Sequence, residues 1–357
     1  MSSGKLPDTM AAVVLEAPNR IKYEDRPVPD TGPGEVLVRV RACALCGTDI
    51  HAWRGLFAGV RLPVVLGHEF AGEVVALGEG VSGMSIGHRC CVENLIVCGE
   101  CEFCSTERPN LCTSLESIGN TLDGAYAEYV SVPAACVVPM PDEVSFTIGS
   151  VMQTLATAYH AVRDVGGVQK GERVAIQGAG PIGLCALAVA KAEGAFVAIS
   201  DTVEYRLEAA RKMGADAVVN PMEADFMTRL DELTGGSGFA KVIEAVGGPQ
   251  EIPLAEACRI VKRNGTVVVM GVFAGDKIPI PAEDVRRLEI VIKGARGRYA
   301  GQFAECLELV ASGRIDIGPM LTHRISLDRA IEGLEMMEDK LDGAIKVVLE
   351  PNGPSDS

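Results

Sequence analysis

The stretch RVAIQGAGPIGLCALAVAKAEG (residues 173–194) joins a short apolar run to a helix-period segment through the turn QGAGPIG. In that turn Gly178, Gly180 and Gly183 have the spacing G-x-G-x-x-G. The first glycine permits a tight turn, the second lets the backbone approach a pyrophosphate, and the third lets helix and strand pack closely. The N-terminus of the following helix attracts the anion. The stretch therefore predicts a dinucleotide-binding unit, with a purely structural glycine turn as the alternative.

An acidic residue follows at the spacing that this unit requires. Asp201 stands at the end of the next apolar run, AFVAIS (195–200), eighteen residues after Gly183. Its carboxylate can accept hydrogen bonds from ribose hydroxyls and would repel a 2′-phosphate, which favours NAD over NADP. Arg206 could pair with a 2′-phosphate, but beside Asp201 we expect it to pack near the adenosine.

Further apolar runs of five to seven residues recur between about residues 171 and 295. They are DAVVN (216–220), KVIEAVG (241–247), GTVVVMG (265–271) and EIVIKG (289–294). Helix-period segments such as EYRLEAARKMG (204–214) and EIPLAEACRIVKRNG (251–265) lie between most of them. Strands that are buried on both faces and alternate with helices indicate a doubly wound parallel sheet in an α/β protein.

The residues before about 141 have a different pattern of apolar and polar residues. Their apolar segments are short, often alternate with polar residues and are broken by turns, as in VLVRVRA (36–42) and GAYAEYVSVP (124–133), which predicts a β-rich domain. The last sixty residues contain two helical patterns and the strand-like AIKVVLEP (344–351). Residues 142–170 are interpreted as a hinge segment between two domains.

Composition limits the possible functions. The 357 residues are too many for one ordinary core and suggest two domains. With 33 Lys and Arg against 48 Asp and Glu, the net charge is −15, so the surface would repel nucleic acid and anionic membranes. No apolar run approaches the roughly 18 residues of a membrane span, and no signal peptide is evident. We therefore expect a cytoplasmic protein that acts on a small molecule.

Four of the twelve cysteines have the spacing of a metal site. They lie in CGECEFCSTERPNLC (98–112) with the spacing C-x2-C-x2-C-x7-C, and are Cys98, Cys101, Cys104 and Cys112. Four thiolates close a tetrahedral zinc shell and leave no position for a substrate, so this zinc would be structural. An iron–sulfur cluster or coincidental buried thiols fit less well.

A second group of candidate ligands has three members, one fewer than a closed zinc site. Cys46, His68 and Glu69 would form a three-ligand zinc site with a fourth position free for water or an alcohol. Such a metal acts as a Lewis acid on oxygen. By spacing alone, a histidine satisfied in a core and a solvated glutamate explain these residues equally well.

Several motifs together resemble one family. CGTDIHAW (46–53), GHEFAGEVVALGEGV (67–81), the four-cysteine lobe, GAGPIG and THRISLDRA (322–330) are similar, in that order and over nearly the whole chain, to the zinc-dependent medium-chain alcohol dehydrogenases. The glutamate after the histidine is similar to the polyol (sorbitol-type) and L-threonine dehydrogenase branches. EYRLEAARKMGAD (204–216) and IVIKGARGRY (290–299) look more like the threonine branch.

The resemblance implies a domain plan. Residues 1–155 would form a GroES-like catalytic domain with a structural zinc lobe at about 94–115. Residues 156–295 would form a Rossmann NAD-binding domain, and residues 296–357 would complete the catalytic domain. A homo-oligomer, most simply a tetramer, is also implied.

The resemblance also implies roles for single residues. Cys46, His68 and Glu69 would bind the catalytic zinc, Thr48 would hydrogen-bond the substrate hydroxyl, and His51 would pass its proton outward. The implied cofactor-binding residues are Gly178, Gly180, Pro181, Ile182, Gly183, Asp201, Arg206, Val246, Met270, Gly271, Val272, Ala295 and Arg296.

Two positions depart from the family pattern. Gln153 stands where the polyol and threonine branches usually have an acidic residue near the zinc, so it is either a neutral metal contact or simple packing. His88 replaces an aspartate in IGHRC (86–90) and is interpreted as structural.

The sequence therefore predicts a zinc- and NAD-dependent dehydrogenase that oxidises a secondary alcohol, either a polyol or a hydroxy amino acid such as L-threonine. Arg54 and Arg61, in the loop WRGLFAGVRLP (53–63), could recognise a carboxylate or phosphate, or could be solvated. A non-catalytic NAD-binding zinc protein with the same fold is the alternative from another class.

Overall fold

A computed structural model describes residues 6–248, 251–273 and 277–355 of the chain. Within it, contacts divide the chain into two compact units. Unit 1 comprises residues 1–153, 303–311 and 321–357, and unit 2 comprises residues 154–302 and 312–320. Because compactness alone does not define a folding domain, the boundaries predicted at 155/156 and 295/296 stay predictions.

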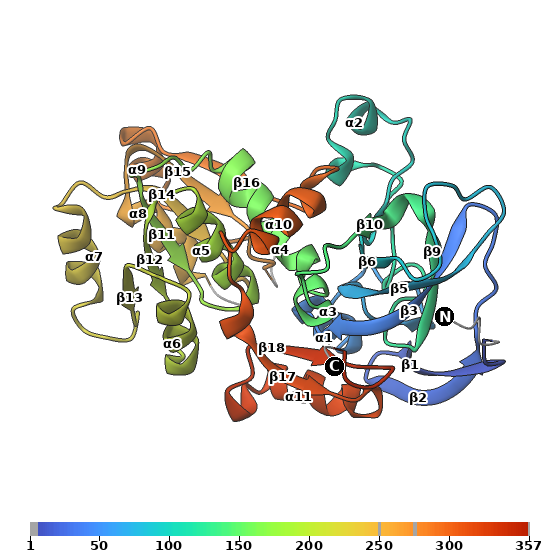
Figure 1. Ribbon diagram of the computed structural model, residues 1–357. Helices are drawn as coiled ribbons and strands as arrows, with labels where there is room; N and C mark the ends of the chain where they lie inside the picture. Colours follow the sequence, from blue (N-terminus) through green and yellow to red (C-terminus); the bar gives the residue numbers. More distant parts are fainter. Residues whose placement is uncertain (1–5, 249–250, 274–276, 356–357) are drawn as a thin grey trace. The chain divides into compact units, whose positions relative to one another are not determined.

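Unit 2 is built on a six-stranded parallel sheet with the order β13-β12-β11-β14-β15-β16 (Figure 1). This order belongs to the dinucleotide-binding doubly wound fold, whose ligands bind where the order reverses, here between β11 and β14. Helix α5 packs on β11 and β12, and α8 packs on β14 and β15. The predicted parallel sheet is confirmed. Its strands are β11 (Arg173–Gln177), β12 (Phe196–Ser200), β13 (Ala217–Val219), β14 (Phe239–Glu244), β15 (Val261–Val269) and β16 (Val291–Gly294).

The helices between these strands follow the predicted periodic segments. They are α5 (Pro181–Ala192), α6 (Glu204–Lys212), α7 (Phe226–Thr234), α8 (Ile252–Ile260) and α9 (Ala282–Arg287). Helix α4 (Met152–Tyr159) precedes the sheet and continues as a π-helix over His160–Val165. In that turn His160 Nδ1 lies 2.9 Å from Asp164 Oδ2, in line with a structural role for this histidine.

The predicted C-terminal end of one helix, at residue 265, is wrong. The helical pattern continues to Gly265, but the structure ends α8 at Ile260 and begins β15 at Val261. Val261 pairs with Phe239 of β14, and the register then shifts before Lys241 pairs with Thr266. Burial of Val261 in this sheet outweighs the helical periodicity of the local sequence.

Unit 1 is β-rich. Its largest sheet has the order β10-β6-β5-β3-β18-β17, with β9 also paired to β3, and a smaller sheet has the order β2-β1-β4 (Figure 1). The strands of these sheets are β1 (Thr9–Ala17), β2 (Arg20–Pro27), β3 (Glu35–Ala44), β4 (Val64–Val65), β5 (Phe70–Leu77), β6 (Arg89–Val92), β9 (Tyr129–Pro133), β10 (Val137–Pro139), β17 (Leu321–Ile325) and β18 (Lys346–Leu349). The chain's last strand therefore lies inside the sheet, beside β3.

Short elements complete unit 1. The cysteine lobe lies between the paired strands β7 (Leu95–Ile96) and β8 (Glu116–Ser117). The helices are α1 (Gly47–Trp53), α2 (Glu102–Ser105), α3 (Phe146–Gly149), α10 (Gln302–Ala311, of which Gln302 falls in unit 2) and α11 (Ala330–Glu338).

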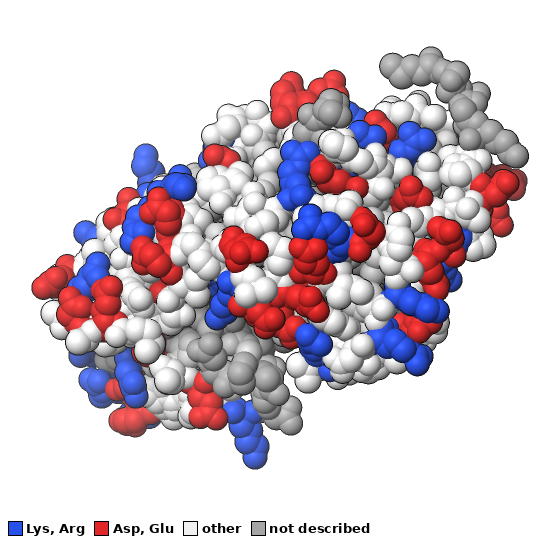
Figure 2. Space-filling model, turned by 90° about the horizontal axis from the view of Figure 1, so that it is seen from below, with Lys and Arg blue, Asp and Glu red and all other residues white. Residues whose placement is uncertain are grey.

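Acidic and basic side chains are interspersed over the face of the molecule shown in Figure 2. Among the described residues, none of the helices combines the length and the apolar character needed to cross a bilayer.

The third glycine of the GAGPIG turn generates a prediction for unit 2. A Cβ at Gly183 would lie 1.9 Å from the carbonyl oxygen of Gly178. We expect Gly183→Ala to lower the free energy of unfolding by roughly 1–3 kcal/mol, because helix α5 must shift away from the turn. Gly294→Ala is the matched control, since a Cβ there meets nothing within 4 Å. Equal denaturant midpoints for both variants would contradict this packing argument.

Candidate functional site

The candidate metal centre begins at the junction of β3 and α1. Cys46 is the N-cap of α1, and the carboxylate of Asp49, in the first turn, accepts a hydrogen bond from the Cys46 backbone N–H at 3.0 Å. This is half of a capping box, which satisfies a donor at the start of the helix. Thr48 Oγ1 lies 3.7 Å from Cys46 Sγ. The helix start thus holds a thiol and a hydroxyl side by side.

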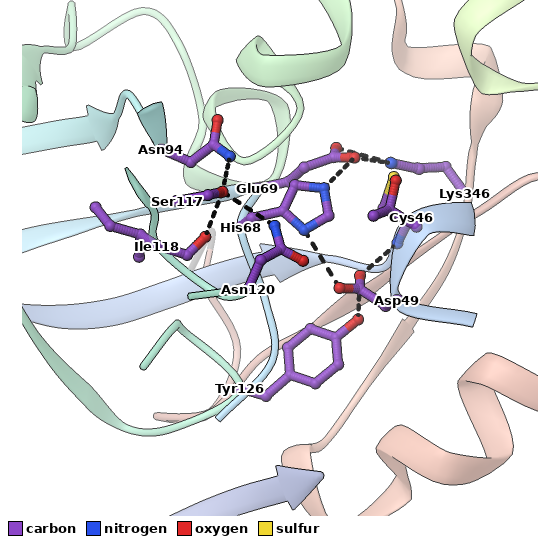
Figure 3. A network of polar contacts seen from close by, with 11 residues as sticks. Cys46, Asp49, His68, Glu69, Asn94, Ser117, Ile118, Asn120, Tyr126 and Lys346 are labelled. Carbon is purple, nitrogen blue, oxygen red and sulfur yellow. Dashed lines mark hydrogen bonds and ion pairs between the residues drawn. The ribbon is translucent and has the colours of Figure 1, made fainter. Parts of the chain in front are cut away.

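The other two candidate ligands come from the turn before β5. Ligand atoms of Cys46, His68 and Glu69 all lie within 4.8 Å of one another. His68 Nδ1 lies 3.2 Å from Asp49 Oδ1, while His68 Nε2 lies 4.0 Å from Glu69 Oε1 (Figure 3). The histidine therefore turns one nitrogen toward a carboxylate and the other toward the candidate ligands, the usual arrangement of a metal-binding histidine.

A buried lysine, which the sequence analysis did not identify, holds Glu69. Lys346 Nζ lies 2.9 Å from Glu69 Oε1 and 2.7 Å from Oε2. The two side chains are 1% and 0% exposed. A buried carboxylate is costly without a partner, so Lys346 supplies the counter-charge that makes burial of Glu69 possible.

The donor set fits a zinc ion with one free position. Tetrahedral zinc ligands of the nitrogen and oxygen type lie about 3.4 Å apart, and the distance of 4.0 Å between His68 Nε2 and Glu69 Oε1 is somewhat longer. A small rotation of Glu69 would close the difference. Gln153, the second residue of α4, is half-buried, and its contact with a metal stays a prediction.

Burial and neighbouring negative charges together determine the pKa values in this cluster. Burial disfavours charge on His68, but the negative charges of Asp49 and Cys46 outweigh it, so the pKa of the imidazole lies well above its usual range. Burial, followed by the charge of Asp49, raises the pKa of the Tyr126 phenol well above its usual range. A zinc ion would take the place of the proton on His68 Nε2.

The four cysteines of the lobe also converge. Cys98 Sγ lies 4.0 Å from Cys104 Sγ and 3.5 Å from Cys112 Sγ, which brackets the ~3.8 Å sulfur separation of a tetrahedral zinc site. Hydrogen bonds from backbone N–H groups lower the pKa of Cys101 to about 6. Burial and the neighbouring thiols raise the pKa of Cys104 to about 12. Without a cation, four adjacent thiols cannot all ionise.

The predicted phosphate-binding turn lies at the carboxyl edge of the unit 2 sheet. Gly178 has φ +91°, and its N–H donates to Ser200 O at 2.7 Å. Asp201 accepts hydrogen bonds from Ala179 N at 2.8 Å and Val203 N at 2.9 Å. This carboxylate therefore braces the loops after β11 and β12. Pro181 and Ile182 begin α5.

The remaining predicted cofactor residues follow β14, β15 and β16, which are neighbours in the sheet. They are Val246, Met270, Gly271, Val272, Ala295 and Arg296. A residue missed from the sequence, the fully buried Glu244, organises the loops after β14 and β15. Its carboxylate accepts hydrogen bonds from Val246 N at 2.8 Å, Gly247 N at 3.1 Å and Gly271 N at 3.2 Å.

The buried ion pair leads to a prediction. Lys346→Met should lower the free energy of unfolding of the metal-free protein by about 3–5 kcal/mol, because it leaves Glu69 as an uncompensated buried charge. Zinc should reduce this loss, since the ion gives Glu69 another positive partner. Denaturant unfolding with chelator and with zinc measures both.

The double variant Lys346→Met/Glu69→Gln is the control, and it should recover most of the stability of the metal-free protein. A loss that zinc does not change, or that the double variant does not reverse, would contradict this role of Lys346.

Comparison with known proteins places the chain in a family. Residues 32–142 match the alcohol dehydrogenase GroES-like domain, and residues 181–312 match the zinc-binding dehydrogenase family. Sorbitol dehydrogenase of Bacillus subtilis (strain 168) is 34% identical over 352 residues, covering 97% of this chain and 99% of that protein. L-threonine 3-dehydrogenase of Pyrococcus furiosus is 34% identical over 330 residues, covering 90% and 93%.

Solved structures agree with these sequence relatives. A zinc-binding dehydrogenase from Sinorhizobium meliloti 1021 bound to NADP has a TM-score of 0.90 and 34% identity, with 97% of this chain and 100% of that chain covered. An alcohol dehydrogenase from Escherichia coli CFT073 complexed with NADH has a TM-score of 0.89 and 28% identity, with the same coverage. The chain therefore belongs to the zinc-dependent medium-chain alcohol dehydrogenase family and combines a GroES-like domain with a Rossmann-type sheet.

Proposed function

We propose that this protein is a zinc- and NAD-dependent dehydrogenase that oxidises a secondary alcohol of a neutral polyol to a ketone. The observation that carries the proposal is the convergence of Cys46, His68 and Glu69 with Thr48 beside the thiol. Three ligands leave one position of a tetrahedral zinc open for a substrate oxygen. The four-cysteine lobe would bind a second zinc, which is structural.

Bound zinc would act as a Lewis acid on the alcohol oxygen, and bound nicotinamide would accept the hydride. The protein's own residues would handle the proton. The Thr48 hydroxyl would take it from the substrate oxygen while releasing its own proton toward His51, which lies three positions further along α1 on the same helix face. His51 is half-buried, so it can pass the proton to solvent.

The carboxylate partners of two arginines support a neutral substrate. Arg54 Nε donates to both carboxylate oxygens of Glu338, at 2.9 and 3.1 Å, and the Arg54 guanidinium stacks 3.7 Å from the centre of the Trp53 ring. Arg61 Nη2 donates to Glu116 Oε1 at 3.1 Å. Both arginines of the loop thus have internal carboxylate partners, so neither offers an uncompensated charge to an acid or a phosphate.

The cofactor preference is inferred from Asp201. Its carboxylate has lone pairs beyond the two that accept backbone N–H groups, and these can accept hydrogen bonds from ribose hydroxyls. Arg206 Nη1 lies 3.8 Å from Asp201 Oδ2, which offsets part of the charge that this arginine could offer to a 2′-phosphate. These contacts support NAD.

A substrate panel tests the proposed activity. With zinc and NAD present, we expect absorbance at 340 nm to rise with polyols and to rise at least tenfold more slowly with β-hydroxy amino acids and polyol phosphates. Cys46→Ser should abolish turnover while the four-cysteine lobe keeps its zinc. A protein that carries zinc at both sites and oxidises no secondary alcohol would refute the proposal. Faster turnover of L-threonine would refute the polyol preference.

The ratio of kcat/KM for NAD to that for NADP tests the role of Asp201. Asp201→Gly should shift this ratio toward NADP by tenfold or more, because the variant loses the ribose acceptor and the repulsion of a 2′-phosphate. The ratio is used because the loss of two backbone hydrogen bonds should weaken the binding of both cofactors. Asp216→Gly, which removes a carboxylate that also accepts a backbone N–H, from Val197 at 2.7 Å, is the matched control. An unchanged ratio in Asp201→Gly would refute the assignment.

A further inference from the structure

The buried tyrosine behind the candidate metal centre has no role in the chemistry described so far. Tyr126 has no exposed surface. Its backbone N–H donates to Leu66 O at 2.8 Å, and its carbonyl accepts from Val13 N at 2.8 Å. A Cβ at Gly67 would lie 2.4 Å from Tyr126 Cδ1, so the ring packs directly on the residue before His68. Packing therefore fixes the position of the phenol ring.

The Tyr126 hydroxyl contacts the carboxylate of Asp49, which in turn contacts two candidate ligands. It donates to Asp49 Oδ2 at 2.8 Å, and the same oxygen accepts the Cys46 backbone N–H at 3.0 Å. The other oxygen, Oδ1, lies 3.2 Å from His68 Nδ1. Figure 3 shows Asp49 between the Tyr126 hydroxyl, Cys46 and the His68 ring.

This arrangement limits how Asp49 can turn. Asp49 is fully buried, so its charge depends on the donors around it. Two donors on Oδ2 hold the carboxylate with Oδ1 toward His68. A carboxylate at His68 Nδ1 selects the tautomer that is protonated there, which leaves the lone pair of Nε2 for a metal. With a phenylalanine ring at 126, the carboxylate would keep only the Cys46 N–H on Oδ2.

We propose that Tyr126 is a positioning residue for the catalytic zinc, acting through Asp49 on His68. The proposal rests on the proposed zinc dehydrogenase function, but it concerns metal binding and can be tested without turnover. Removing the hydroxyl should weaken the Cys46–His68–Glu69 site by tenfold or more, the usual effect of losing such an outer contact. The four-cysteine lobe should be unaffected.

The experiment compares Tyr126→Phe with Tyr129→Phe. Tyr129 is also buried, lies three residues further along the chain and donates no hydrogen bond from its hydroxyl in the part of the chain that the structure describes. Chelator competition gives the zinc affinity of both metal sites, so the lobe serves as an internal standard. Cobalt substitution adds a spectrum that reports the geometry of the Cys46–His68–Glu69 site.

A double-mutant cycle separates positioning from general destabilisation. If Tyr126 acts through Asp49, Tyr126→Phe should cost little further zinc affinity in an Asp49→Asn background. Unchanged zinc affinity and cobalt spectrum in Tyr126→Phe, or an equal loss in both backgrounds, would overturn the proposal. A protein that oxidises no alcohol but shows the expected affinity changes would refute only the proposed function.

Discussion

The buried ion pair between Lys346 and Glu69 is the contact on which the candidate metal centre depends. Its two residues are 277 positions apart. They meet because β18 lies beside β3 in the large sheet of unit 1, where Val348 pairs with Ala44 at the end of β3. A glutamate with no exposed surface needs a positive partner. The centre is therefore complete only when the end of the chain has joined the sheet.

The sequence predicted the elements whose signals are local. Six apolar runs correspond to β11–β16, and the glycine spacing identifies the turn after the first of them. The two groups of candidate ligands, four cysteines in one lobe and the set at 46, 68 and 69, are also those that the structure brings together. The error at residues 261–265 has the opposite cause, because the pairing of Val261 with Phe239 is a long-range contact that local periodicity does not encode.

The residues that were missed share a property that could have revealed them. Lys346 in AIKVVLEP and Glu244 in KVIEAVG are charged residues flanked by apolar ones. A charge in a strand that is buried on both faces must have a partner, so each of these residues predicts a buried polar contact. The identity of the partner could not be predicted from the sequence, because it comes from a distant strand or from the backbone. The same limit applies to Arg54 and Arg61, whose carboxylate partners Glu338 and Glu116 lie outside their own loop.

Lys346 sets the charge balance of the candidate metal centre. Cys46 as a thiolate, Glu69 and Asp49 carry three negative charges, and Lys346 with a divalent zinc would carry three positive ones. An alcohol that gives up its proton adds one negative charge to a centre that is then neutral. Without Lys346 the centre would be negative before the alcohol ionises, which would raise the cost of that added charge. Lys346 therefore both makes the burial of Glu69 possible and would favour the ionisation of an alcohol bound at the centre.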